Sequence, residues 1–85
     1  VIVEHVAWNG LGKVAKVLVD KSLSVKEKLD KAYMLTQNIN DGWWNNELVT
    51  NISQEDALRS TSVEDIMHIN GDKYMVGMVG FKKLN

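Results

Sequence analysis

The chain has 85 residues, a formal net charge of −1 and no cysteine. This length gives one small domain, residues 1–85, whose single hydrophobic core is close to the minimum that folds alone. Without cysteine neither disulfides nor thiolate metal sites form, and the near-balance of charge argues against both a general nucleic-acid binder and a DNA mimic.

The apolar segments of the sequence are short. No apolar run approaches the roughly 20 residues that span a bilayer, and no signal-peptide pattern follows Val1. The simplest interpretation is a soluble protein of the cytoplasm that has no membrane partner.

The first 20 residues predict a β-hairpin. Residues 1–8 are rich in β-branched side chains, and residues 9–12 contain two glycines suited to a turn. Residues 13–20 fit both the spacing of an amphipathic helix and the alternation of a strand. The preceding turn and the valines favour a second strand.

An amphipathic helix is predicted over residues 25–38. Ser24 and Glu27 form a capping box, in which each side chain accepts from the other residue's backbone N–H. Apolar residues then recur at spacings of three and four, which is the pattern of one helix face. The members of this stripe are Val25, Leu29, Ala32, Thr36 and Ile39.

The centre of the chain reads as irregular structure. Residues 38–46 combine four asparagines with an Asp-Gly step, which is typical of a loop. Residues 47–52 are short and apolar enough for a strand, and residues 53–58 resemble a single capped turn before the C-terminal segment.

The segment from Arg59 to Leu84 predicts a second β-hairpin. Two alternating stretches flank Asn70-Gly71-Asp72, whose residues suit the positive φ angles of a tight hairpin turn. Either turn register places the same apolar side chains on one face, which we expect to be core: Val63, Met67, Ile69, Tyr74, Val76 and Met78. The opposite face, which includes Phe81, is mixed, and Gly77 and Gly80 indicate a bend in the second strand.

Together these elements predict an α+β fold. The expected order is β-β-α-(β)-β-β, a small antiparallel sheet made of N- and C-terminal hairpins with one main α-helix packed on a face.

Part of the sequence carries a family resemblance. It lies in Arg59-Ser60-Thr61-Ser62-Val63, Asp65-Ile66, the glycine-containing turn, Tyr74 and Gly80-Phe81, and it extends upstream through Ala32-Tyr33, Thr36-Gln37-Asn38 and Trp43. On these residues the chain resembles small uncharacterised proteins of large tailed bacteriophages and other mobile elements, and it is similar to YodL-like domains. The resemblance covers roughly residues 29–84 and departs at Glu64, where such proteins often have glycine. It implies a phage accessory protein of unknown biochemistry and supplies no catalytic residues.

Trp43 and Trp44 are the first candidate binding residues. Adjacent tryptophans in a polar loop do not easily both point inward, so an exposed ring would serve as a protein anchor or as a platform for bases or sugars. The competing interpretation is that one ring fills the core and the other lies over the sheet, because so small a domain needs its large side chains for burial.

Arg59, Ser60, Thr61 and Ser62 are the second candidate site. One guanidinium and three hydroxyls are a set of donors that would hold an anion. The alternative is that the hydroxyls cap the chain before the strand while Asp65 or Glu64 pairs with Arg59.

The remaining inventory argues against an enzyme, a cofactor and a metal site. No nucleophile–base motif or glycine-rich phosphate loop is present, and the two histidines, His5 and His68, lack metal-ligand spacing and are expected to face solvent.

The leading hypothesis is therefore a non-enzymatic phage protein that binds and modulates a host or phage protein. The alternatives are a small-ligand or nucleic-acid binder that uses the two candidate sites, or a structural component of a larger assembly. Steep weakening of binding with salt would indicate phosphate contacts, and self-association would favour the assembly.

Overall fold

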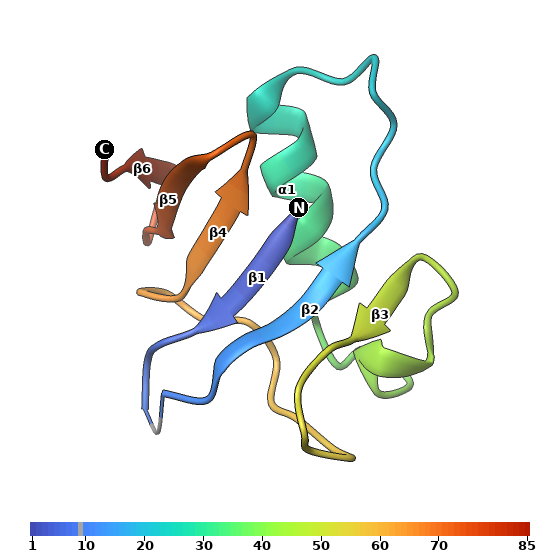
Figure 1. Cartoon of the computed structure of the whole chain (residues 1–85). Helices are drawn as coiled ribbons and strands as arrows, with labels where there is room; N and C mark the ends of the chain where they lie inside the picture. Colours follow the sequence, from blue (N-terminus) through green and yellow to red (C-terminus); the bar gives the residue numbers. More distant parts are fainter. Residues whose placement is uncertain (9) are drawn as a thin grey trace.

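An antiparallel sheet backed by a helix organises the molecule. The computed structural model describes residues 1–8 and 10–85, and within them the sheet has six strands in the order β3-β2-β1-β4-β5-β6 (Figure 1). In chain order the elements are β1 (Ile2–His5), β2 (Gly12–Val17), α1 (Val25–Leu35), the 3-10 turn η1 (Trp43–Asn45), β3 (Val49–Asn51), β4 (Ile66–Ile69), β5 (Asp72–Val76) and β6 (Phe81–Lys83). Helix α1 covers one face of the sheet, so the predicted α+β class is confirmed.

The N-terminal hairpin is confirmed, although its first strand is shorter than predicted. β1 ends at His5 rather than at residue 8, and it pairs antiparallel with β2 through a register shift between Val3 and Glu4. Gly10 and Gly12 have positive φ angles of 57° and 82°, as a turn rich in glycine allows. Asn9, part of the predicted turn, lies outside the described residues.

Helix α1 begins as predicted and ends early. Ser24 Oγ accepts from Glu27 N at 3.1 Å, and Glu27 Oε1 accepts from Ser24 N at 3.0 Å, which completes the capping box. The helix stops at Leu35 instead of residue 38. Thr36 leaves the helical conformation with a φ of −107° and a ψ of 29°, and its hydroxyl donates to Ala32 O at 2.8 Å. Such side-chain bonds satisfy terminal carbonyls without a further turn.

The C-terminal hairpin closes through the predicted tight turn. Ile69 pairs with Asp72 across Asn70-Gly71, whose φ angles are 53° and 84°. Positive φ at both central residues defines a type I′ turn, the geometry that matches strand twist. Met67, Ile69 and Val76 are buried on the helix side, as expected.

The end of this segment differs from the prediction. Gly77 and Gly80 mark a full reversal rather than a bend, because Gly77 N donates to Gly80 O at 2.9 Å and Gly80 has a φ of 74°. A sixth strand, β6, follows and places Phe81 on the core side, where its ring lies 6.5 Å from that of Tyr33. Val63 and Met78 fall outside the strands and are exposed, so their assignment to the core was wrong.

Candidate functional site

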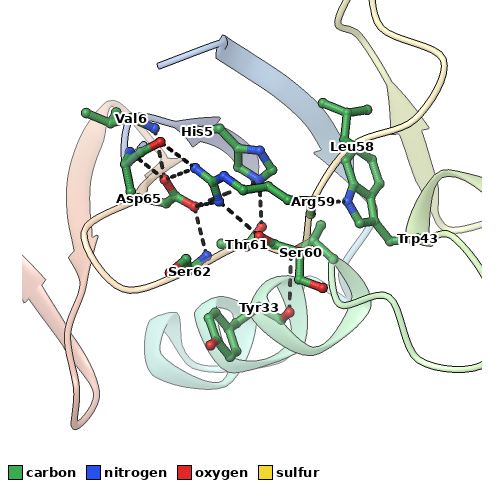
Figure 2. Close-up of polar contacts among 12 residues, drawn as sticks. His5, Val6, Tyr33, Trp43, Leu58, Arg59, Ser60, Thr61, Ser62 and Asp65 are labelled. Atoms are coloured by element: carbon green, nitrogen blue, oxygen red, sulfur yellow. Dashed lines mark hydrogen bonds and ion pairs between the residues drawn. The ribbon is translucent and has the colours of Figure 1, made fainter. Parts of the chain in front are cut away.

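An ion pair between the buried Asp65 and the partly exposed Arg59 holds together the end of the sheet at which β1 stops. The Asp65 side chain is 0% exposed, and its carboxylate accepts from Arg59 Nη1 and Nη2 at 2.6 and 2.9 Å (Figure 2). The same carboxylate accepts from three backbone N–H groups: Val6 at 2.9 Å, Ala7 at 3.0 Å and Ser62 at 2.8 Å. We call this set, with Asp65 and Arg59 at its centre, the clasp.

The clasp keeps Asp65 ionised. Burial acts to raise the pKa of this carboxyl, but the hydrogen bonds from Arg59 and from the N–H groups of Ser62, Ala7 and Val6 outweigh burial and lower the pKa below its ordinary value. A carboxylate that already accepts from so many donors is a structural anion, and it is poorly suited to accept a substrate proton.

Arg59 is engaged on both sides of the clasp. Besides Asp65, its Nη2 donates to Ala7 O at 2.8 Å and its Nη1 to Ser60 O at 2.9 Å. The pairing of Arg59 with Asp65 was one of the two alternatives that the sequence left open. The guanidinium thus joins the segment that follows β1 to the segment that precedes β4.

The neighbouring hydroxyls also make internal contacts. Ser60 Oγ accepts from Asn38 N at 2.8 Å, and Thr61 Oγ1 lies 3.1 Å from His5 Nε2. Ser62 enters the clasp through its backbone N–H. Four of the candidate residues, Arg59 to Ser62, therefore lie together and make hydrogen bonds within the chain.

His5 is a correction to the sequence analysis. It was expected to face solvent, yet it is fully buried, 3.9 Å from Asp65 and edge-on to Trp43 with ring centres 6.3 Å apart. Burial lowers the pKa of His5, an effect that Arg59 reinforces and Asp65 opposes. His68, by contrast, is half-buried and lies 2.7 Å from Glu4.

The two candidate tryptophans divide into a buried ring and a half-buried one. Trp43 is 2% exposed, and its Nε1 donates to Arg59 O at 2.9 Å. Trp44 lies edge-on to Trp43 at 5.6 Å and packs so closely over Gly42 that a Cβ there would lie 2.3 Å from the Trp44 ring. Trp43 thus joins the clasp region, whereas Trp44 lies outside it.

A different tryptophan provides the exposed aromatic surface. Trp8 is 83% exposed and has a φ of 65°, and it borders a groove of about 680 Å³. We call this the Trp8 groove; it is lined by Trp8, Leu11, Glu55, Ala57, Leu58 and Arg59. The sequence analysis placed Trp8 within a strand, although the Asn-Gly pair that follows it is a signal that the ring belongs to a turn.

The clasp explains where Trp8 lies. Val6 N, Ala7 N and Ala7 O, the backbone groups immediately before Trp8, are all held by Asp65 or Arg59. Arg59 also lines the groove. The ion pair therefore fixes the chain on which the exposed ring is carried.

Within residues 1–8 and 10–85, no three histidine, cysteine or acidic side chains are grouped as a metal site. None of the helices described there is long and apolar enough to cross a membrane. The chain matches no protein-family model, no curated protein and no solved structure.

Proposed function

We propose that this protein is a non-enzymatic binding domain that holds another protein in the Trp8 groove. The observation that carries this proposal is Trp8 itself, a large apolar side chain that is both exposed and conformationally strained.

The Trp8 side chain contributes little to the stability of the fold, although its backbone conformation is strained. A ring that is 83% exposed removes little apolar surface from water. A bulky residue at a φ of 65° costs on the order of 1–3 kcal/mol relative to a relaxed backbone. Strained residues of this kind cluster at binding and catalytic sites, and exposed tryptophans are among the commonest energetic anchors of protein interfaces.

The chemistry of the groove indicates the kind of partner. Leu11, Ala57 and Leu58 make it mainly apolar, and the charge of Arg59 is balanced by Asp65. Glu55 is then the lining charge that forms no ion pair among the described residues. A protein segment that presents an apolar side chain beside a lysine or arginine fits this arrangement.

The clasp supports a binding role over catalysis. Asp65 is buried and saturated with hydrogen-bond donors, and His5 is buried with a lowered pKa. Both groups are buried within the scaffold and closed to a substrate.

The biological setting of the proposal comes from the resemblance of residues 29–84. A phage accessory protein acts within the host cytoplasm, so the partner we propose is a host or phage protein found there.

The test is a comparison of three baits: the wild type, Trp8→Gly and Met78→Ala. Glycine accepts positive φ, so Trp8→Gly removes the ring without adding strain, and Met78, which is 91% exposed, is the matched control. Proteins captured from infected and uninfected host cells should include a partner that binds the wild type and Met78→Ala but not Trp8→Gly. The binding free energy of this partner should be weaker by about 2 kcal/mol in Trp8→Gly, which is the scale of an aromatic hot spot.

Two results would contradict the proposal. A partner that binds all three baits equally would use another surface. A partner lost by both variants would depend on exposed apolar area in general and not on the groove.

A further inference from the structure

The face of the sheet opposite α1 carries an ordered arrangement of side chains. In the part of the chain that the structure describes, no helix lies over this face (Figure 1). Antiparallel pairing sets directly opposed residues side by side on one face of a sheet, so the register of the strands gives the order of side chains across it.

Two cross-strand rows follow from this register. The first runs from β2 to β5 through Lys16, Ile2, His68 and Lys73. Between β2 and β5 this row begins and ends with an exposed lysine and has half-buried side chains between them, and beyond Lys16 it continues to the exposed Thr50 of β3.

The second row has the same plan. It runs from β2 to β6 through Lys13, Glu4, Ile66, Met75 and Lys82. Its end lysines are again exposed, and its inner residues are half-buried. We call the two rows together the lysine-bordered face.

The four lysines of this face outnumber its one acidic residue, Glu4, so their charge is only partly compensated within it. Among the described residues none of Lys13, Lys16, Lys73 and Lys82 makes an ion pair, whereas Glu4, the acidic member of the rows, is 2.7 Å from His68. The chain as a whole has a net charge of −1, so positive charge is concentrated here against the overall balance.

The centre of the face combines three aliphatic side chains with the ion pair of Glu4 and His68. Ile2, Ile66 and Met75 lie between the lysines and are half-buried. At a strand spacing of roughly 4.8 Å, the lysines that end the two rows stand roughly 14 and 19 Å apart. An apolar centre with a charged rim is the common anatomy of a protein interface.

We propose that the lysine-bordered face binds an acidic protein segment, with carboxylates against the lysines and aliphatic side chains against Ile2, Ile66 and Met75. Charge complementarity selects the acidic partner. This surface shares no residue with the Trp8 groove. Together with the partner proposed for the groove, the domain would hold one basic and one acidic protein segment.

A nucleic acid fits this face less well. Sheets that bind single strands use aromatic rings on which bases stack, and the two rows contain no phenylalanine, tyrosine or tryptophan. The aliphatic side chains at the centre would also offer nothing to a phosphate backbone, so a duplex would contact the lysines alone.

A synthetic peptide provides a defined probe. In a fluorescein-labelled nonapeptide, two Glu-Glu pairs flank Ser-Leu-Ile-Leu-Ser, so the pairs lie roughly 20 Å apart when extended. Matched probes are the same peptide with glutamine in place of each glutamate, and a labelled 20-base-pair DNA duplex. Anisotropy titration with the whole protein at fixed ionic strength compares the three.

The acidic peptide should bind at least about tenfold more tightly than the glutamine peptide and the duplex, because the lysines meet carboxylates only in the first. The double variant Lys16→Glu/Lys73→Glu should weaken binding of the acidic peptide at least about tenfold. The control Lys21→Glu/Lys31→Glu, which makes the same charge change at exposed positions outside the sheet, should change its affinity less than about twofold.

Other outcomes would overturn the proposal. Tighter binding of the duplex would make the face a nucleic-acid surface. Three results would contradict an acidic partner: equal binding of both peptides, equal weakening by both double variants, or no binding at millimolar peptide. Loss of peptide binding in Trp8→Gly would move the peptide to the groove. If the capture experiment finds no partner that depends on Trp8 while the acidic peptide still binds, the groove proposal fails and the proposal for this face stands.

Discussion

The two long hairpins of the sheet close in different ways. The β4–β5 connection is two residues, Asn70-Gly71, and both take the positive φ angles of a type I′ turn. The longer β1–β2 connection is held by the side chains of Asp65 and Arg59, which lie more than 50 positions along the chain. The β4–β5 turn is determined by its own two residues and needs no contact from elsewhere in the chain. The β1–β2 connection is held by distant residues, and it is this connection that carries an exposed tryptophan.

The largest expected effect comes from removing the clasp. Asp65→Ala leaves Arg59 without its partner and the N–H groups of Val6 and Ala7 without acceptors. We expect a loss of about 3–5 kcal/mol in the free energy of unfolding, the scale for breaking a buried ion pair. Urea unfolding measures it, with Asp72→Asn as the control.

Asp72 makes a 3.6 Å ion pair with Lys83 that is substantially exposed. Its loss should cost less than about 1 kcal/mol, as surface pairs do. Similar losses in the two variants would mean that the clasp does not support the β1–β2 connection more than an ordinary surface contact would.

The free energy of unfolding should decrease in two stages as the pH falls, because two groups at the clasp change protonation. The pKa of His5 is lowered from 6.5 in the fold, so as pH falls below 6.5 the unfolded chain takes up a proton that the fold excludes, and stability decreases. The pKa of Asp65 is lowered from 3.8, so the stability it contributes is present above that pH and is lost as pH falls below it.

Unfolding free energies measured in urea between pH 8 and pH 3 test both stages. His5→Gln should remove the decrease that begins near pH 6.5 and leave the decrease below 3.8. An unchanged first stage in this variant would assign it to another group.

The β4–β5 turn should be more tolerant than the clasp. Gly71 has a φ of 84°, and no atom would lie within 4 Å of an added Cβ, so Gly71→Ala adds backbone strain without a collision. We expect a loss of about 1–2 kcal/mol in unfolding free energy, the cost of a left-handed alanine. A loss of stability as large as that of Asp65→Ala would mean that the fold depends equally on the two connections.

The smallest effect on stability should come from Trp8→Gly. Glycine relieves the strain of this position but raises the conformational entropy of the unfolded chain, and these two effects oppose each other. The net change in unfolding free energy should be no more than about 1 kcal/mol, in either direction. Thermal or urea unfolding measures this change. A loss of several kcal/mol would show that Trp8 belongs to the core and would remove it as a binding anchor.

The sequence predicted the features that short-range chemistry determines. The capping box of Ser24 and Glu27 and the turn at Asn70-Gly71 each depend on residues within four positions, so pattern was sufficient. Strand β6 was missed because two glycines suit a bend and a reversal equally well.

The clasp was only partly predictable. Arg59 and Asp65 are close in sequence, and their pairing was among the alternatives, but their hydrogen bonds to Val6 and Ala7 come from the pairing of β1 with β4. The same pairing places His5 beside Asp65 and fixes the backbone that precedes Trp8. No local pattern in the sequence encodes this pairing of β1 with β4.

The pairing of β1 with β4 also has a kinetic consequence. His68 and Glu4, which meet on these central strands, are 64 positions apart. Closing a loop of that length costs roughly 1.6 kcal/mol more entropy than closing one of ten residues, and such non-local contacts slow folding. On the ribosome each hairpin can form as it emerges, but β1 must wait for β4 to be synthesised, so the two halves of the sheet join only after Ile69 has been added.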